Sequence, residues 1–275
     1  HRARKQNPHA ILVAAGCYVQ TGTDDLRKDI GVDILLGNNH KQELPKLLGD
    51  FEERRKLQQT GEQMEQLSDI SRPSSYEELK VPAPAGHTRA FLKVQDGCNQ
   101  FCSYCIIPYA RGRVRSRRPE DVEAEVRQLA DRGFLEIVLT GIHLSSYGRD
   151  FPDASPDLYS LIERIHAVGL CPHFHLSLQS GSDTVLKRMN RRYTSAEYLE
   201  KCAILKEAFR DPAITTDIIV GFPGETEEEF ADSCRIVTEA GFSDVHIFKF
   251  SRRKGTPADR MPDQLTEAVK TERAR

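Results

Sequence analysis

Hydrophobic and polar positions along the chain form two series of strand-like and helix-like segments. In the first series, short apolar runs at 10–16 and 32–37 predict strands. Polar, helix-compatible segments at 18–30 and 40–56 follow them. Strand, helix, strand and helix in this order predict part of an open parallel sheet.

The second series begins near residue 87 and is longer. Its helix at 119–133 opens with proline and acidic residues and ends on glycine, as helices commonly do. Repeated βα units with apolar strands predict a parallel barrel or part-barrel, so the expected class is α/β. The predicted strands are 89–95, 134–141, 173–181, 213–224 and 244–251, and the other predicted helices are 156–169, 195–209 and 226–241.

The stretch between the two series has a weak pattern. Residues 58–86 are polar, rich in proline and almost without periodicity, which predicts an interdomain connection. We therefore expect a domain at 1–57, a linker at 58–86 and a second domain at 87–275. An irregular surface excursion within a single domain is the alternative.

Composition narrows the class of protein. The chain has 275 residues, of which 39% are hydrophobic and 29% charged, so it can bury a core and is not disordered. The longest apolar run, at 10–17, is far too short to cross a bilayer, and no signal region follows the basic start. A cytoplasmic protein without a membrane partner is expected. The net charge of −2 does not mark the whole chain as a nucleic-acid binder.

Three of the seven cysteines lie within eight residues. Cys98, Cys102 and Cys105 follow the predicted strand 89–95. Because ligands of parallel βα folds sit at the carboxyl ends of strands, these cysteines are expected on the functional face. In a reducing compartment, clustered cysteines usually bind metal or take part in catalysis.

The spacing of this cluster favours iron and sulfur over zinc. Structural zinc sites need four ligands, commonly in two separated pairs, and no second pair follows here. A 4Fe–4S cluster held by three thiolates would leave one iron open for a substrate or cofactor. A non-catalytic zinc- and RNA-binding module remains the competing class.

Several motifs together resemble the radical S-adenosylmethionine enzymes, and among them the methylthiotransferases. The resemblance rests on CNQFCSYC at 98–105, LTGIHLSSYG at 139–148, LSLQSGSDTVLKRMNRRYT at 176–194, GFPGE at 221–225 and FKFSRRKGTPA at 248–258. It implies a partial (β/α) barrel of the radical-SAM type, preceded by part of an open α/β methylthiotransferase domain. Among these enzymes, the chain most resembles those that methylthiolate N6-threonylcarbamoyladenosine beside the tRNA anticodon.

The resemblance also implies the cofactors. Cys98, Cys102 and Cys105 would hold a 4Fe–4S cluster whose open iron binds the amino and carboxylate groups of S-adenosylmethionine. One electron would then generate a deoxyadenosyl radical that takes hydrogen from C2 of the base. Sulfur from an auxiliary cluster would be inserted, and a second S-adenosylmethionine would supply the methyl group.

Polar and glycine positions mark the expected cofactor face. By strand alternation, Ser177 and Gln179 lie on that face as partners for the ribose or sulfonium, although such residues could equally fill a barrel layer. The backbone from Gly221 to Gly224 can approach the adenine closely. The full set of expected cofactor-binding residues is Tyr104, Gly141, Ser177, Gln179, Gly221, Phe222 and Gly224.

A fourth cysteine, Cys17 in GCYVQ, is by itself most simply a small core residue. The motif resembles the last of three cysteine motifs that hold a second 4Fe–4S cluster in the family. The other two would precede position 1, and a small RNA-binding domain would follow the last residue, so the chain looks truncated at both ends. The resemblance also implies a strand and helix near residues 170–171 that this sequence lacks, either through a deletion or because those residues are not included. Cys202 and Cys234, on predicted helices, are expected in the core.

A basic run beside the cysteine loop suits phosphate recognition. Residues 111–118 contain five arginines, and Arg111, Arg113, Arg115 and Arg117 are the expected RNA contacts. A charge run is more often a solvated face. By resemblance, the substrate would be tRNA and the reductant flavodoxin or ferredoxin, with the enzyme a monomer. Isopentenyladenosine in tRNA and a ribosomal-protein aspartate are the alternative substrates.

Overall fold

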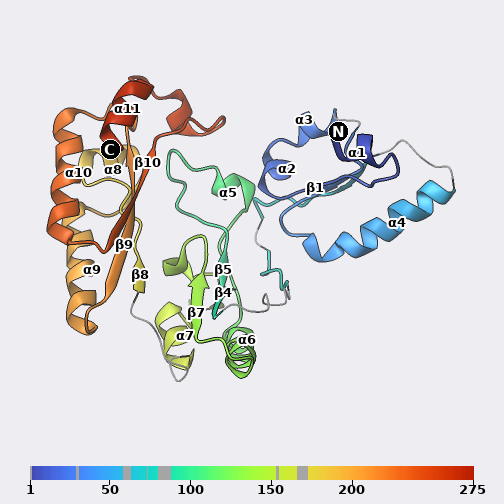
Figure 1. Ribbon diagram of the computed structural model, residues 1–275, viewed down its shortest axis with the longest axis horizontal. Helices are drawn as coiled ribbons and strands as arrows, with labels where there is room; N and C mark the ends of the chain where they lie inside the picture. Colours follow the sequence, from blue (N-terminus) through green and yellow to red (C-terminus); the bar gives the residue numbers. More distant parts are fainter. Residues whose placement is uncertain are drawn as a thin grey trace. The chain divides into compact units, whose positions relative to one another are not determined.

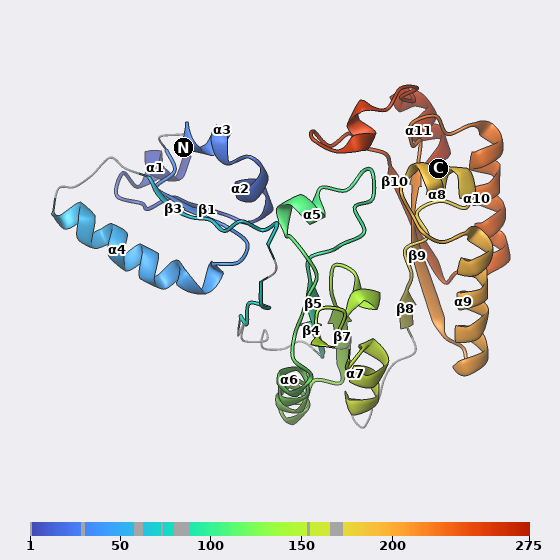
Figure 2. The ribbon, with the colours of Figure 1, turned by 180° about the vertical axis from the view of Figure 1, so that it is seen from behind.

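The computed structural model describes residues 2–28, 31–57, 63–72, 74–79, 88–152, 155–165 and 173–275. The chain forms two compact units, drawn with their helices and strands in Figures 1 and 2. Unit 1 comprises 1–99 and 107–169, and unit 2 comprises 100–106 and 170–275. The boundary therefore divides the cysteine loop between the first and second cysteine. The apparent gap at residues 170–171 lies outside the described residues.

Unit 1 begins with a small parallel sheet. Its strands β1 (Val13–Ala15), β2 (Ile34–Leu36) and β3 (Met64–Gln66) pair in the order β1-β2-β3. The central strand is fully buried, and its Ile34 and Leu36 pack with Leu47. The accompanying helices are α1 (Arg2–Gln6), α2 (Cys17–Thr21), α3 (Thr23–Arg27), the 3-10 turn η1 (Lys41–Glu43) and α4 (Leu44–Lys56).

The strand β3 lies in the segment that its weak pattern predicted to be a linker. Only Met64 of this three-residue strand is buried, so the sequence MEQ carries no strand periodicity. Pairing with β2 in register Ile34 to Met64 holds it in the sheet. Part of the predicted linker, 58–62, 73 and 80–86, lies outside the described residues.

The second part of unit 1 contains the first βα units of the longer series. β4 (Arg89–Lys93) and β7 (Glu136–Thr140) pair in parallel, and β5 (Gln95–Asp96) pairs antiparallel with β6 (Arg115–Ser116). The helical segments are α5 (Ile107–Ala110), α6 (Pro119–Asp131), η2 (Leu144–Ser146) and α7 (Leu158–Ile165). Proline at its first position and two acids in its first turn favour the start of α6.

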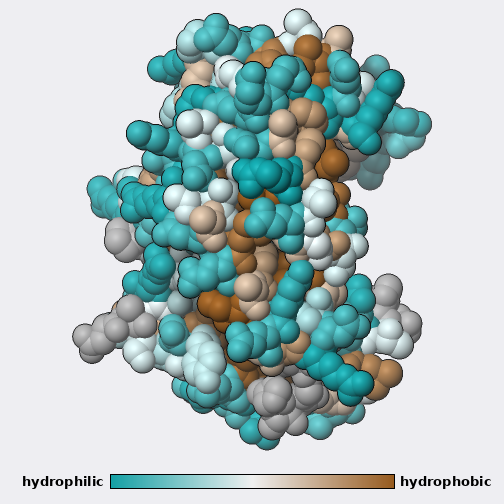
Figure 3. Space-filling model, turned by 90° about the vertical axis from the view of Figure 1, so that its left-hand side faces the viewer, coloured by the Kyte–Doolittle hydropathy of each residue, from teal (hydrophilic) through white to brown (hydrophobic). Residues whose placement is uncertain are grey.

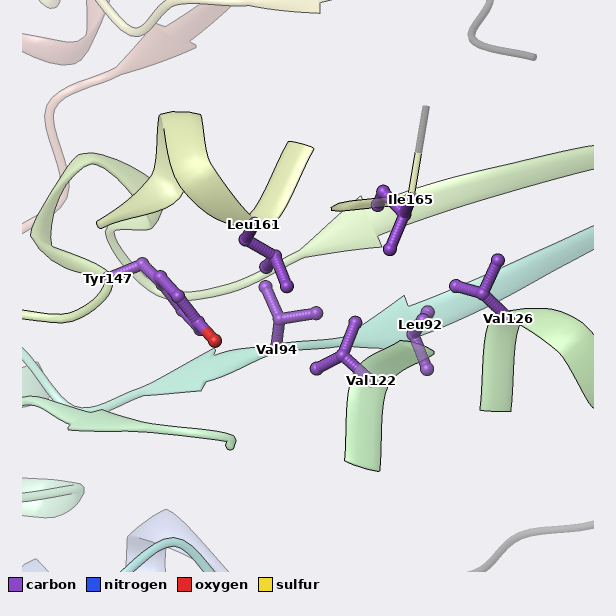
Figure 4. Packing of buried hydrophobic residues seen from close by; sticks show 7 residues of the cluster. All are labelled: Leu92, Val94, Val122, Val126, Tyr147, Leu161 and Ile165. Carbon is purple, nitrogen blue, oxygen red and sulfur yellow. The ribbon is translucent and has the colours of Figure 1, made fainter. Parts of the chain in front are cut away.

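These strands and helices share one hydrophobic core. Figure 4 shows Leu92 and Val94 facing Val122 and Val126 of α6, with Leu161 of α7 alongside. Burial of such side chains from water supplies most of the favourable free energy of folding. This core holds the end of β4, from which the cysteine loop starts.

Unit 2 is a three-stranded parallel sheet with helices on one face. β8 (His173–His175), β9 (Ala213–Val220) and β10 (Asp244–Lys249) pair in the order β10-β9-β8. In Figures 1 and 2, α9 (Ser195–Ala208) and α10 (Glu227–Ala240) lie along one face of this sheet. The remaining helical segments are α8 (Asp183–Arg188), η5 (Pro257–Arg260) and α11 (Glu267–Arg273).

Alternation along β9 separates the two faces of the sheet. Ile214, Ile218 and Val220 join the core under α9 and α10. Figure 3 views the helix-covered side, where hydrophilic side chains dominate. Within the described residues, no helix is long and apolar enough to cross a membrane.

Both long helices of unit 2 begin with a reciprocal cap. Thr194 and Thr226 each accept a hydrogen bond from the backbone N–H three residues later, and Glu197 and Glu229 each reach back to the cap. Such a capping box satisfies two backbone donors that the first turn leaves without partners. These local signals explain why both helices were predictable from sequence.

Two predictions about unit 2 need correction. The strand predicted at 173–181 spans only His173–His175, because an extra residue between the pairs His175–Thr215 and Gln179–Ile218 breaks the ladder with β9. Cys234 is exposed rather than in the core, since the buried positions of α10 are Ser233, Ile236 and Ala240. Cys202 is buried as expected.

Candidate active site

The first cysteine stands at a tight turn of unit 1. The backbone N–H of Cys98 donates to the carbonyl of Gly112 at 3.0 Å. Gly97 before it has a φ of 69°, and a Cβ there would lie 1.8 Å from the carbonyl oxygen of Arg113. Only glycine fits this close approach, which directs the chain from β5 into the cysteine loop.

The other two cysteines lie on a segment that the backbone of unit 2 holds in place. The N–H of Cys105 donates to the carbonyl of Cys102 at 3.0 Å. Ser103 between them donates its N–H to the carbonyl of Met189 at 2.9 Å and accepts from the N–H of Ala258 at 2.8 Å. The Asn190 amide donates to two further carbonyls of this segment, at residues 100 and 101. The loop therefore has a defined conformation.

Tyr104 connects the cysteine loop to the sheet of unit 2. Its hydroxyl donates to Oε1 of Gln179 at 3.2 Å, and its ring meets Phe222 edge-on at 6.3 Å. Burial raises the pKa of Tyr104 well above its ordinary value, so the hydroxyl stays protonated and remains a donor. Three predicted site residues are thus in contact.

A half-buried cation, Arg191, lies beside this segment. Burial lowers the pKa of Arg191, but Tyr104, Tyr193 and Cys102 raise it by more, so the net shift is upward. Its Nε is buried and has no hydrogen-bond partner, and the same is true of the hydroxyl oxygen of Ser103. Unpartnered buried polar atoms are costly, and these two lie next to a cysteine.

The hydroxyl of Ser177 is already engaged within the sheet. It donates to Oδ2 of Asp217 at 2.9 Å, while the carbonyl of Ser177 accepts from Tyr193. Gln179, by contrast, is held by backbone hydrogen bonds with Asp217 and Ile219, and its side-chain oxygen accepts a hydrogen bond from the Tyr104 hydroxyl. The roles predicted for Ser177 and Gln179 toward a cofactor stay predictions.

The glycine turn after β9 is built over a buried ion pair. Gly221 has a φ of 73°, and its N–H donates to Oε2 of Glu225 at 2.7 Å. Arg273 of α11 contacts the same oxygen at 2.7 Å, with both side chains almost fully buried. A Cβ on Gly221 would lie 2.4 Å from Cγ of Lys270. Glycine at 221 is thus required by α11, whatever the turn also binds.

Phe222 and Gly224 complete this turn. Phe222 is fully buried and packs edge-on against Phe250 at 5.3 Å. Gly224 has a φ of 72° and no atom near its missing Cβ, so its conformation rather than crowding favours glycine. The turn is rigid on its α11 side and reaches the cysteine loop through Phe222 and Tyr104.

Gly141 lies in unit 1, where β7 ends. A Cβ there would lie 2.9 Å from Leu144 and 3.0 Å from Oε1 of Gln95. The same Gln95 oxygen accepts the N–H of His143 at 2.8 Å. Crowding by its own unit therefore explains this glycine, and its predicted cofactor contact remains a prediction.

The arginine run after the cysteine loop is largely internal. Arg111 and Arg115 pair with the buried Asp96 at 3.2 and 3.3 Å. Arg117 is buried between Glu78 and Glu125, at 2.8 and 2.6 Å. Their burial and pairing favour a structural role for Arg115 and Arg117 over contact with RNA, whereas Arg113 is only half-buried.

Cys17 is the first residue of α2 and has polar neighbours. Nδ2 of Asn38 lies 3.6 Å from the sulfur of Cys17 and 2.5 Å from the carbonyl of Ala110 in α5. Burial lowers the pKa of Arg111, but Asp96 and Cys17 raise it by more. Within unit 1, Cys17 therefore lies against the helix whose chain follows the cysteine loop.

Four residues of this site were missed by sequence reasoning. Asn38 stands in a segment without a motif, whereas Arg191 and Glu225 lie within the motifs at 176–194 and 221–225 but were not singled out as site residues. Arg273 is far along the chain from its partner. The only available signal was Glu225 directly after a glycine turn, since a carboxylate there can accept turn N–H groups.

The donor chemistry suits an iron–sulfur cluster, although the described residues contain no group of three or more His, Cys, Asp or Glu side chains already arranged to hold a metal ion. Cysteine thiolates are the usual ligands of such clusters. Three thiols stand within eight residues, and buried polar atoms without partners, on Ser103 and Arg191, lie beside one of them.

Parallel βα units with a cysteine loop and a glycine turn at strand ends define a cofactor-binding βα enzyme. The model of the Radical SAM superfamily matches residues 92–166 and 150–237, which together span more than half of the chain. Structural similarity agrees: the radical S-adenosylmethionine methyltransferase TsrM from Kitasatospora setae superposes over 91% of this chain and 57% of its own, with a TM-score of 0.65 at 16% identity.

Similar sequences narrow the family further. The threonylcarbamoyladenosine tRNA methylthiotransferases of Bacillus subtilis and Aquifex aeolicus are 42% and 39% identical, over 99% and 100% of this chain and 65% and 72% of their own lengths. A tRNA-2-methylthio-N(6)-dimethylallyladenosine synthase of Pelotomaculum thermopropionicum is 37% identical over 99% of this chain and 66% of its own length. The chain belongs to the methylthiotransferases of the radical SAM superfamily. It spans about two thirds of these relatives.

Proposed function

We propose that the protein converts N6-threonylcarbamoyladenosine beside the tRNA anticodon to its 2-methylthio derivative. The observation that carries this is the 42% identity to a threonylcarbamoyladenosine tRNA methylthiotransferase over 99% of the chain. The ordered cysteine loop and the glycine turn provide the parts that the radical-generating half of such a reaction needs.

Cys98, Cys102 and Cys105 would hold the radical-generating cluster. A 4Fe–4S cluster at these thiolates would supply the single electron that breaks a carbon–sulfur bond of bound S-adenosylmethionine. Tyr104, anchored by its hydroxyl to Gln179, fixes the segment that carries the last two cysteines. The backbone from Gly221 to Gly224 offers a surface without side chains for the flat adenine.

Cys17 would be a ligand of a second, auxiliary cluster that handles the sulfur. The Asn38 amide beside its sulfur can donate a hydrogen bond, and hydrogen bonds to the ligand sulfurs tune the reduction potential of iron–sulfur clusters. This role belongs to a methylthiotransferase domain at 1–57, joined through 58–86 to the radical SAM domain at 87–275, a division that we keep as part of the proposal.

The partners would be tRNA and an electron donor such as flavodoxin or ferredoxin. Arg113 and the exposed Arg118 are better placed for phosphate than the buried Arg115 and Arg117. A second candidate substrate is N6-dimethylallyladenosine, because relatives 37% identical over 99% of the chain are named for that base.

Nucleoside analysis of tRNA tests the proposal directly. In a strain that lacks the gene, mass spectrometry should show loss of 2-methylthio-N6-threonylcarbamoyladenosine and accumulation of its precursor. The wild-type gene and a Cys234→Ala variant should restore the product, because Cys234 is exposed on α10. Cys102→Ala should not. Restoration by Cys102→Ala would refute the cluster assignment, and loss of the dimethylallyl derivative instead would favour the second candidate.

A further inference from the structure

The open face of the unit 2 sheet carries a group of polar side chains, of which only Ser177 has a role above, as a predicted cofactor partner. His175, Ser177, Asp217 and His246 form what we call the polar layer. Alternation places them opposite Ile214, Ile218 and Val220, which pack under the helices. Neighbouring strands bring them together, because His246 is the register partner of Asp217.

Hydrogen bonds fix three members of the polar layer. Asp217 Oδ2 accepts from the hydroxyl of Ser177 at 2.9 Å and lies 3.1 Å from Nε2 of His175. Nδ1 of His175 is 2.9 Å from the hydroxyl of Thr215. A side chain held at both ring nitrogens cannot turn, so the layer presents a fixed pattern of donors and acceptors.

The fourth member remains accessible. The His246 ring lies 5.8 Å from that of His175 and its side chain is half exposed. Its Nδ1 is 3.9 Å from Asp244, too far for a hydrogen bond. Among the described contacts of this sheet, its imidazole is therefore the donor best placed to meet a ligand.

The polar layer lies directly beside the cofactor-bearing end of the sheet. Gln179, which accepts the Tyr104 hydroxyl, follows Ser177 by two residues and bridges Ile218, the residue after Asp217 on β9. Above His246 on β10, the exposed Phe248 pairs in register with Ile219. Along the strands, an apolar row that contains Phe248 and Ile219 is thus followed by the hydrogen-bonding side chains of the polar layer.

We propose that the polar layer binds the N6 substituent of the substrate base and selects a hydrogen-bonding substituent over a hydrocarbon one. This inference rests on the proposed function. With that function, the polar layer favours the threonylcarbamoyl group over the dimethylallyl group. The threonylcarbamoyl group offers N–H and hydroxyl donors to Asp217 and a carboxylate to the His246 imidazole. The donors and the carboxylate of this substituent thus each meet a complementary group in the polar layer.

The dimethylallyl group would be rejected for a physical reason. Covering this layer with hydrocarbon would remove water from Asp217 and His246 without replacing their hydrogen bonds. Sites built to hydrogen-bond a substituent reject analogues that lack it much more strongly than apolar sites reject polar ones. Specificity here would thus arise mainly from the penalty on the wrong base.

Binding of modified anticodon stem-loops tests this without requiring turnover. The complete gene product, loaded anaerobically with iron and sulfide, is titrated with stem-loops carrying either N6-threonylcarbamoyladenosine or N6-dimethylallyladenosine. We expect tighter binding of the first. His246→Phe should reduce the preference at least about tenfold, as expected for the loss of one hydrogen-bonding partner that the bound substituent would cover. His173→Phe, the same change two residues before His175, is the matched control and should leave the preference unchanged.

The outcomes separate this inference from the proposed function. Equal binding of the two stem-loops by the wild type, or a preference that survives His246→Phe, overturns the role of the polar layer. Ser177→Ala, which removes one small donor to Asp217, gives a second variant should His246→Phe fail to fold, and it should also weaken the preference. Absence of any methylthio product on either RNA would instead refute the proposed function, whatever the binding preference.

Discussion

Two buried carboxylates, one near the first cysteine and one at the glycine turn, respond to burial in opposite ways. Burial alone would raise the pKa of Asp96, but Lys93, the N–H of Gly97 and Arg111 outweigh it, and the pKa lies below its usual range. Burial likewise raises the pKa of Glu225, and there Gly221 and Arg273 do not offset it.

The difference follows from the number of partners. Asp96 meets three cations, Lys93 at 2.5 Å, Arg111 at 3.2 Å and Arg115 at 3.3 Å. Glu225 meets Arg273 at 2.7 Å, and its Oε1 is buried without a partner. The pKa of Arg273 is also raised, although burial opposes it. The pair therefore favours the charged form of Arg273 but not the charged form of Glu225. Burial, with Oε1 left without a partner, thus outweighs Arg273 in raising the pKa of Glu225.

Removing the better-paired carboxylate should have the largest effect. Asp96→Asn leaves Lys93, Arg111 and Arg115 together without their counter-charge, which should destabilise unit 1 by about 3–5 kcal/mol. Urea denaturation followed by a probe in unit 1 measures this. Asp131→Asn on the exposed side of α6 is the control and should change stability by less than about 0.5 kcal/mol. A small effect of Asp96→Asn would show that these cations are well solvated.

Removing the single cation beside Glu225 should cost somewhat less. Arg273→Met leaves a buried carboxylate that can take up a proton, so we expect about 3 kcal/mol of destabilisation, at the lower end for a broken buried pair. A Glu225→Gln, Arg273→Met double variant should regain part of it in the unfolding transition of unit 2. Additive losses in the double variant would contradict the pairing.

The pH dependence of the Glu225 contribution should have the opposite sign to that of Asp96. A folded pKa above 4.5 means that the Glu225 contribution is complete below 4.5 and is lost as the pH rises through the folded pKa. As the pH rises from 4.5 through the folded pKa, Glu225→Gln should therefore gain stability relative to the wild type. The stabilisation from Asp96 is present above 3.8 and is lost as the pH falls through its lower folded pKa. Parallel pH profiles for both sites would disprove the contrast.

The smallest effect should come from removing one of several cations. Lys93→Met leaves Asp96 with both arginines, and burial already lowers the pKa of Lys93 despite its hydrogen bond to Asp96. We expect a loss below about 1 kcal/mol in the free energy of unfolding. A loss as large as that of Arg273→Met would mean that partner number does not explain the difference.

The sequence by itself determined most of the alternating βα order and the clustering of three cysteines in one loop. Both depend on local information: apolar periodicity, helix caps such as Thr194 and Thr226, and the spacing of Cys98, Cys102 and Cys105. Family resemblance in the same segments agreed with the comparison to known methylthiotransferases.

Only the tertiary structure decided which polar residues are internal. Arg115 and Arg117, expected to meet RNA, are buried because Asp96 and Glu78, carboxylates outside the arginine run, neutralise them. The strand β3 exists only through pairing with β2, and the polar layer forms only where β8, β9 and β10 align in register. Such contacts join residues that are far apart in sequence, so no local pattern of hydrophobic and polar positions contains them.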